Sequence, residues 1–159
     1  MDQSRILVDV ALKAWSQQIS RAEKFFDAQT DDGLLKEVAP GRNRLIYLLG
    51  HLTSSNETMM TLFGLGPKLY PGYEETFSRK PDKSGLPFPA VDELRKAFRE
   101  TNKNLTEHFA KMSVNDWLSK HTAMTDEDLA KEPTRNRLSV MMSRTSHVAY
   151  HMGQAVLVK

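Results

Sequence analysis

Cysteine is absent from this chain of 159 residues. Its absence excludes disulfide bonds, thiolate metal ligands and a cysteine nucleophile, so any bound metal must use nitrogen or oxygen ligands. The sequence also has no run of about 18 apolar residues, the length that a membrane-spanning helix needs. The first residues, MDQSRILVDV, do not form the basic stretch and apolar core of a signal peptide. We therefore expect a cytoplasmic protein with no membrane partner.

Charge of one sign is also scarce. The 22 lysines and arginines are interleaved with 20 aspartates and glutamates, and the formal net charge is only +2. Nucleic-acid affinity normally depends on clustered basic residues, so nucleic acid is not an expected partner. Hydrophobic residues make up 40% of the chain, an ordinary globular content, and the length fits one domain over residues 1–159.

Apolar residues recur at spacings of three, four and seven in four segments, whereas strand-like alternation is poor. The segments cover about residues 3–28, 45–63, 94–112 and 138–155. Between the second and third lie residues 64–89, which hold five of the seven prolines and so cannot form one helix. A polar connector, Asn115 to Pro133, precedes the fourth segment. The pattern predicts an all-α fold, a four-helix bundle with a long crossover between helices 2 and 3.

The tetrapeptide RNRL occurs twice, at residues 42–45 and 135–138, each time just before an apolar helical stripe. Asparagine is a favoured N-cap because its side chain accepts a hydrogen bond from the first turn of a helix. We therefore predict that Asn43 and Asn136 cap the second and fourth helices. The sequences that follow diverge at once, so a shared helix start explains the repeat better than a duplication.

Two histidines, His147 and His151, are four residues apart in a segment that reads as helix. This spacing puts both imidazoles on one face, within reach of one metal ion. The alternative is that both are partly buried residues bonded to their neighbours. His51 favours the metal site, because it lies at the edge of the apolar stripe of the second helix. Such positions on two helices of a bundle can converge on one interior point.

The segments LIYLLGHLTSSNETMM and RTSHVAYHMGQ resemble the two metal-binding segments of the DinB-like superfamily. One ligand of that family is the histidine of a "GH" pair in helix 2, and the other two form an HxxxH followed by "GQ" in the last helix. The matching residues here are Gly50 and His51, then His147, His151, Gly153 and Gln154. The resemblance covers essentially the whole chain. It implies a DinB-like four-helix bundle, a three-histidine divalent metal site and a homodimer.

Three neutral imidazoles leave coordination positions open, as in catalytic metal sites. Zinc or nickel is the expected ion, although iron and manganese also accept such ligands. The resemblance implies either a hydrolase or a transferase with a low-molecular-weight thiol as cosubstrate, acting on a small molecule. The alternative is a non-catalytic, metal-stabilised dimeric module for binding or stress response.

No catalytic base is identified by the sequence. In HExxH metalloproteases a glutamate follows the first histidine, but Val148 holds that position here, which argues against such a peptidase. Glu57 lies six residues after His51 and so away from the ligand face. A base would have to come from the metal-bound water itself or from another segment.

Two residues flank the histidine pair at helical spacing. We hypothesise that Arg144 contacts an anionic group of the substrate and that Gln154 holds an imidazole by a hydrogen bond. Surface solvation or helix packing is the alternative for both. Aromatic side chains in the crossover either form a lid or binding wall or pin the crossover to the bundle. They are Tyr70, Tyr73, Phe77 and Phe88.

Overall fold

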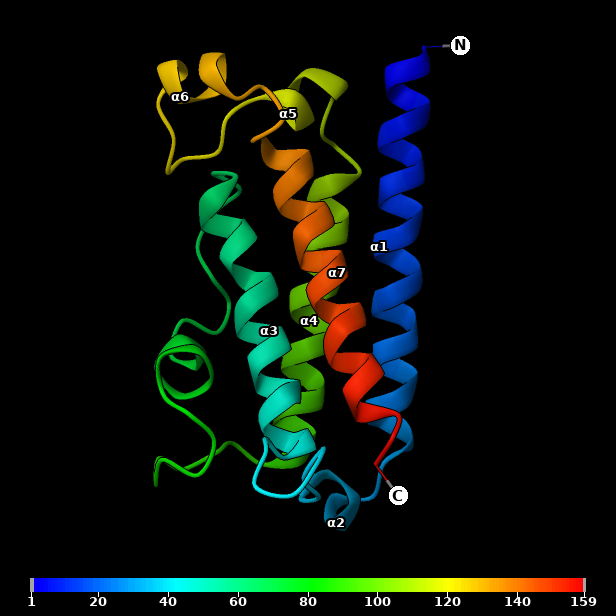
Figure 1. Cartoon of the computed structure of the whole chain (residues 1–159), viewed down its shortest axis with the longest axis vertical. Helices are drawn as coiled ribbons and strands as arrows, with labels where there is room; N and C mark the ends of the chain where they lie inside the picture. Colours follow the sequence, from blue (N-terminus) through cyan, green and yellow to red (C-terminus); the bar gives the residue numbers. More distant parts are fainter. Residues whose placement is uncertain (1, 159) are drawn as a thin grey trace.

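Four long helices form the frame of the protein, whose computed structural model describes residues 2–158. They are α1 (Gln3–Ala28), α3 (Leu45–Leu62), α4 (Val91–Phe109) and α7 (Arg137–Ala155), and they run alongside one another (Figure 1). The short elements are α2 (Asp31–Leu34), the π-helical turn η1 (Glu75–Arg79), α5 (Val114–Leu118) and α6 (Asp126–Lys131). No strand occurs within the described range, so the all-α prediction is confirmed.

Helix α3 is the most enclosed of the four, because α4, α7 and the crossover all contact it. Most of its residues are buried, from Leu45 to Met60, and not just one apolar stripe. A helix covered on several sides must bond its polar side chains inside the protein. Asn56 does so by donating to Asn102 Oδ1 of α4 at 2.9 Å. The helix that carries His51 is thus held on several faces.

The connector predicted between Asn115 and Pro133 contains two short helices, α5 and α6. Trp117 of α5 is fully buried in the core, so this segment is more than a polar linker. Helices of five and six residues are too short to show a periodic pattern, which explains the error. Their local start signals are present, since Ser113 and Thr125 both accept hydrogen bonds from the first turn.

The N-cap prediction is right for Asn136 and wrong for Asn43. Asn136 Oδ1 accepts from the Ser139 backbone N–H at 3.1 Å. At α3 the N-cap position is Arg44, whose side chain makes no capping bond. Instead the Asp82 carboxylate accepts from the Arg44 backbone N–H at 2.8 Å and from its guanidinium at 2.6 Å. A partner 38 residues away replaces the local cap.

The crossover between α3 and α4 packs on α3 rather than extending into solvent (Figure 1). Phe77 is fully buried, and a Cβ atom built on Gly50 would lie 2.5 Å from its ring. Buried Glu57 accepts from the backbone N–H groups of Leu69 and Tyr70 at 2.5 and 2.8 Å. These contacts pin the crossover, and they give Glu57 a structural task.

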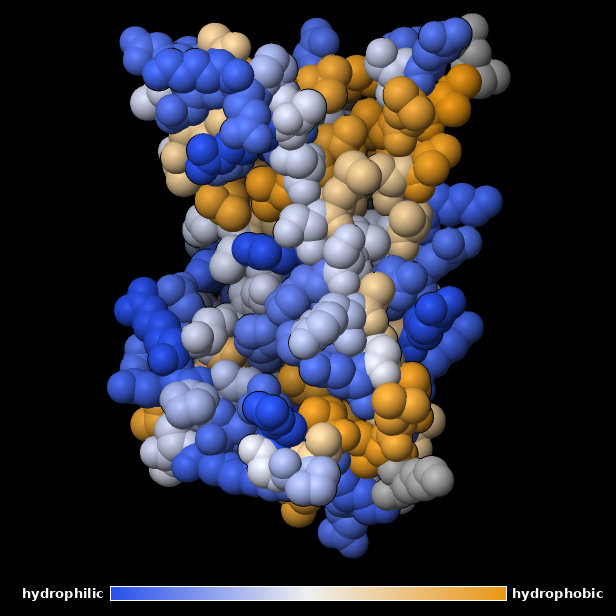
Figure 2. All heavy atoms as spheres, in the orientation of Figure 1, coloured by the Kyte–Doolittle hydropathy of each residue, from blue (hydrophilic) through white to orange (hydrophobic). Residues whose placement is uncertain are grey.

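The surface carries an apolar face over the N-terminal half of α1 and the adjoining part of α7 (Figure 2). A groove between the two helices is lined by Leu7, Val10, Leu138 and Met142. None of the helices within residues 2–158 is both long enough and apolar enough to cross a bilayer.

Candidate metal centre

Three histidines meet between α3 and α7. The Nε2 atom of His147 lies 3.1 Å from Nε2 of His51 and 3.0 Å from Nε2 of His151. A tetrahedral ion with bonds of about 2.0–2.1 Å separates its nitrogen ligands by about 3.3 Å. Small side-chain adjustments reach that spacing, so the three histidines could hold one metal ion.

The outer nitrogen of each ring is held by a neighbour. His51 Nδ1 lies 2.7 Å from the Phe77 carbonyl oxygen, and His151 Nδ1 lies 2.8 Å from Gln154 Oε1. His147 Nδ1 lies 3.3 Å from the Ser55 hydroxyl. A carbonyl oxygen only accepts, so His51 carries its proton on Nδ1 and turns the Nε2 lone pair towards the other histidines. Metal-binding histidines commonly have such outer partners.

The three rings are suited to bind a cation in their neutral form. Burial lowers the pKa of His51, His147 and His151. The pKa of His147 falls to about 4, mainly through burial and further through positive charge on the other two histidines and Arg144. Metal binds neutral imidazole, so protons do not compete near pH 7. No carboxylate of residues 2–158 joins the group. The donor set is three nitrogens, with coordination positions left for other ligands.

A family model described as the DinB superfamily matches residues 14–155. The chain belongs to the DinB superfamily. The match spans α3 and α7 and therefore all three histidines. No curated protein matches the chain.

The "GH" pair of this DinB chain has a physical explanation. Gly50 has no side chain, so the Phe77 ring can lie directly on α3. That approach brings the Phe77 carbonyl oxygen to His51 Nδ1. The glycine therefore helps to position His51, the residue beside it, through the crossover. The sequence singled out Phe77 only as an aromatic residue of the crossover, and its carbonyl contact with His51 was missed because a backbone acceptor leaves no residue pattern.

Ser55 was also missed, although its spacing offered a signal. It follows His51 by four residues, which puts both side chains on the α7-facing side of α3. Its hydroxyl reaches His147 on α7, as described above. The serine one turn after His51 could therefore have been predicted from the sequence to contact a histidine of the group.

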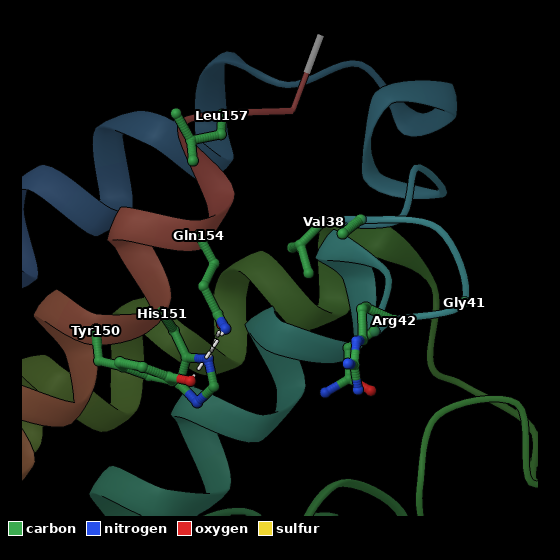
Figure 3. A pocket seen from close by; sticks show the side chains of 9 residues that line it. Val38, Gly41, Arg42, Tyr150, His151, Gln154 and Leu157 are labelled. Atoms are coloured by element: carbon green, nitrogen blue, oxygen red, sulfur yellow. Dashed lines mark hydrogen bonds between the residues drawn. The ribbon is translucent and has the colours of Figure 1, made fainter.

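A cavity of about 660 Å³ opens beside the three histidines of the DinB chain (Figure 3). Of the three histidines only His151 lines it, together with Gln154 and Tyr150 from α7. Gln154 bonds to both neighbours, because its Nε2 donates to the Tyr150 hydroxyl at 3.2 Å while its Oε1 faces His151. The centre and the cavity therefore share a wall.

Arg144 lies between α7 and α3 and does not line this cavity. Its Nε donates to the Ser55 carbonyl oxygen at 3.1 Å and its Nη2 faces the Thr58 hydroxyl at 3.3 Å. Within the described residues no carboxylate pairs with it. Val148 is fully buried in the core, so the residue after His147 supplies no base.

Proposed function

We propose that this chain is a metal-dependent enzyme that transfers a group of a small molecule to a low-molecular-weight thiol. One observation carries the proposal: three neutral imidazole nitrogens converge on one point, and one of the three rings, His151, also lines the 660 Å³ cavity. A three-nitrogen donor set leaves positions for reactants, which a closed structural site would not. Zinc or nickel is the ion we propose.

A thiol suits this centre better than water as the nucleophile. When bound, the ion would supply Lewis acidity, which deprotonates a coordinated thiol outright and brings the pKa of coordinated water to about 7. The chain has no cysteine of its own, and no carboxylate joins the three histidines within residues 2–158. A thiol therefore needs no side-chain base here. A hydrolase that uses water in place of the thiol is the second candidate.

The residues around the ligands hold the rings in the geometry that the chemistry needs. Phe77, Gln154 and Ser55 each contact an outer ring nitrogen and so limit ring rotation. Arg144 adds a positive charge three residues before His147, and no carboxylate of residues 2–158 pairs with it. We propose that this charge attracts an anionic substrate at long range, because the side chain does not line the cavity. Unchanged affinity of Arg144→Met for an anionic substrate, once one is known, would contradict this role.

Metal content is the first test. Untagged protein purified without chelator is analysed by inductively coupled plasma mass spectrometry, beside His51→Ala and the double variant His147→Ala/His151→Ala. His108→Ala is the matched control, because His108 lies on α4 outside the group. We expect about one ion per chain in the parent and control, and loss from both ligand variants with helix content retained. A parent that stays empty after incubation with zinc, nickel, iron and manganese contradicts the proposal.

Activity is tested on the metal-loaded protein with electrophile and ester panels. Consumption of glutathione or another small thiol that needs both the metal and His147 supports the transferase. Ester hydrolysis without thiol dependence supports the second candidate. If metal removal lowers the melting temperature but no turnover is found, the non-catalytic binding module becomes the better description.

We also propose a homodimer formed through the apolar face of α1 and α7. Leu7, Val10 and Met142 line its groove and are exposed by 68%, 61% and 52%. Such contiguous apolar surface is typical of interfaces. Sedimentation velocity should show a dimer that Leu7→Glu/Val10→Glu converts to monomer, while Leu118→Glu on α5 has no effect. A monomeric parent at micromolar concentration contradicts the dimer.

A further inference from the structure

One wall of the cavity carries a cationic side chain, opposite the wall that holds His151. Arg42 lies in the loop between α2 and α3, across the cavity from His151 and Gln154 (Figure 3). Its guanidinium forms no hydrogen bond or ion pair with any residue from 2 to 158. The acidic residue of the same loop, Glu37, is already engaged by Lys83 and by the Gly41 backbone N–H.

The backbone that carries Arg42 is held by the loop's own hydrogen bonds. Val38 N–H donates to the Asn43 carbonyl oxygen at 2.9 Å, and Arg42 N–H donates to the Ala39 carbonyl oxygen at 2.9 Å. Between them Pro40 precedes Gly41, whose φ is 74°, the pattern of a type II turn. A closed turn keeps Arg42 at the cavity without a side-chain partner. Its charge is therefore available to a ligand.

The rest of the lining has a different character. Val38 and Leu157 present aliphatic surface, and Tyr150 adds an aromatic ring. Among residues 2–158, Arg42 is the one lysine or arginine in the lining. A ligand that fits would combine one negative charge with an apolar body. One guanidinium matches one carboxylate in a bidentate pair, whereas a doubly charged phosphate group at the Arg42 wall would find one cationic side chain among the described lining residues.

We propose that this cavity binds small molecules that carry a single carboxylate, with Arg42 as the residue that selects it. The carboxylate pairs with the guanidinium, the apolar body contacts Val38, Leu157 and the Tyr150 ring, and the far end reaches the His151 wall. This rests on the proposed function for what happens to the substrate. Carboxylate binding itself can be measured without turnover.

The test compares two ligands of the same shape. Zinc-loaded protein is titrated by calorimetry with 3-phenylpropionate and with its neutral amide, 3-phenylpropionamide, and phenyl phosphate serves as a dianionic probe. The titrations are repeated on Arg42→Gln and on Arg21→Gln, a matched control at an exposed arginine of α1 outside the cavity. Metal content is measured for every sample.

We expect the carboxylate to bind at least about tenfold more tightly than the amide in the parent and in Arg21→Gln. Arg42→Gln should remove that preference while its zinc content stays unchanged. Chemical shifts of backbone amides in ¹⁵N-labelled protein should move at Gly41, Asn43 and Gln154. Equal affinity for acid and amide, or unchanged carboxylate affinity in Arg42→Gln, overturns the proposal. Tighter binding of phenyl phosphate than of the carboxylate overturns it as well.

The two proposals fail in different ways. If His147→Ala/His151→Ala has lost its metal yet still prefers the carboxylate through Arg42, the carboxylate site stands without the metal centre. If zinc binds normally but Arg42→Gln keeps the full affinity for 3-phenylpropionate, the acid is held elsewhere, and the Arg42 site is wrong while the metal centre stands.

Discussion

The ring of Phe77 lies so close to Gly50 that an added Cβ atom would fall 2.5 Å from its Cδ1 atom. In a helix interior, alanine is otherwise favoured over glycine by about 0.5–1 kcal/mol. Packing and helix propensity therefore act in opposite directions at this position, and a substitution can tell them apart.

We predict that Gly50→Ala lowers the free energy of unfolding by roughly 1–3 kcal/mol, because the methyl group must displace the Phe77 ring. Gly153→Ala is the matched control in α7, where an added Cβ meets nothing within 4 Å, and it should stabilise by up to about 1 kcal/mol. Urea unfolding of both variants measures this. Stabilisation by both would mean that Phe77 moves aside at little cost.

Gln154→Ala should weaken metal binding by about 10–100-fold, because the His151 ring loses the Gln154 oxygen that holds its Nδ1 atom. Tyr150→Phe should have a smaller effect, since the Tyr150 hydroxyl contacts the Gln154 amide and not the ring nitrogen. Competition with a chromophoric chelator gives the affinities, with Gln17→Ala on α1 as control. Equal affinities in parent and Gln154→Ala would show that this hydrogen bond does not orient the ligand.

Acid should weaken the link between the crossover and α3. Burial raises the pKa of Asp82, but hydrogen bonds from the Arg44 guanidinium and backbone N–H outweigh it, so the pKa lies below the ordinary 3.8. A carboxyl group with a depressed pKa stabilises the fold above its unfolded pKa and loses that contribution as the pH falls through its folded value.

Asp82→Asn should therefore lower the melting temperature at neutral pH, and the difference from the parent should shrink below pH 3.8. Asp9→Asn, which removes an exposed partner of Arg5, should change little. Differential scanning fluorimetry across pH measures both. A difference that stays constant into acid would mean that the charge of Asp82 is not the cause.

The stability of the fold should tolerate loss of the Glu57 charge but not loss of the oxygen that accepts the two hydrogen bonds. Burial raises the pKa of Glu57 against the opposing hydrogen bonds from the Tyr70 and Leu69 N–H groups. The folded state therefore favours the neutral carboxyl group, and this contribution to stability is lost as the pH rises through the folded pKa. Glu57→Gln keeps an acceptor and should be at least as stable as the parent at pH 7. Glu57→Ala leaves two backbone N–H groups without a partner and should cost about 2 kcal/mol. Chemical unfolding at pH 7 distinguishes the two outcomes.

The long helices could be predicted because their apolar periods are long enough to read. The expected first segment, 3–28, coincides with α1, and the second, 45–63, ends within one residue of α3. Short elements such as α5 carry only a local cap and escape a periodicity search. Asn43 is not the cap because Arg44 holds the N-cap position of α3. The distant Asp82 carboxylate accepts from the Arg44 backbone N–H, and no local pattern predicts such a contact.

The histidine pair of α7 was predictable from its spacing, and His51 was added from its place beside the apolar stripe and from the resemblance to DinB-like segments. The surroundings of the three histidines were not predictable. His147 and His151 must share a face at a spacing of four, whatever the tertiary structure. The Phe77 carbonyl and the turn that presents Arg42 depend on how loops fold back on the bundle. Arg42 is part of the RNRL repeat, which was interpreted from the sequence only as a helix start.

The hydrogen bond from His51 to the Phe77 carbonyl oxygen joins the crossover to the proposed metal centre. Such coupling is reciprocal in free energy. If packing of the crossover on α3 raises the affinity of the three histidines for an ion, then the bound ion favours the packed crossover by the same factor. Hydrogen exchange of the crossover amides should thus slow on metal loading. A shortage of metal would show first as more frequent local opening of the crossover, which exposes the face of α3 beneath it.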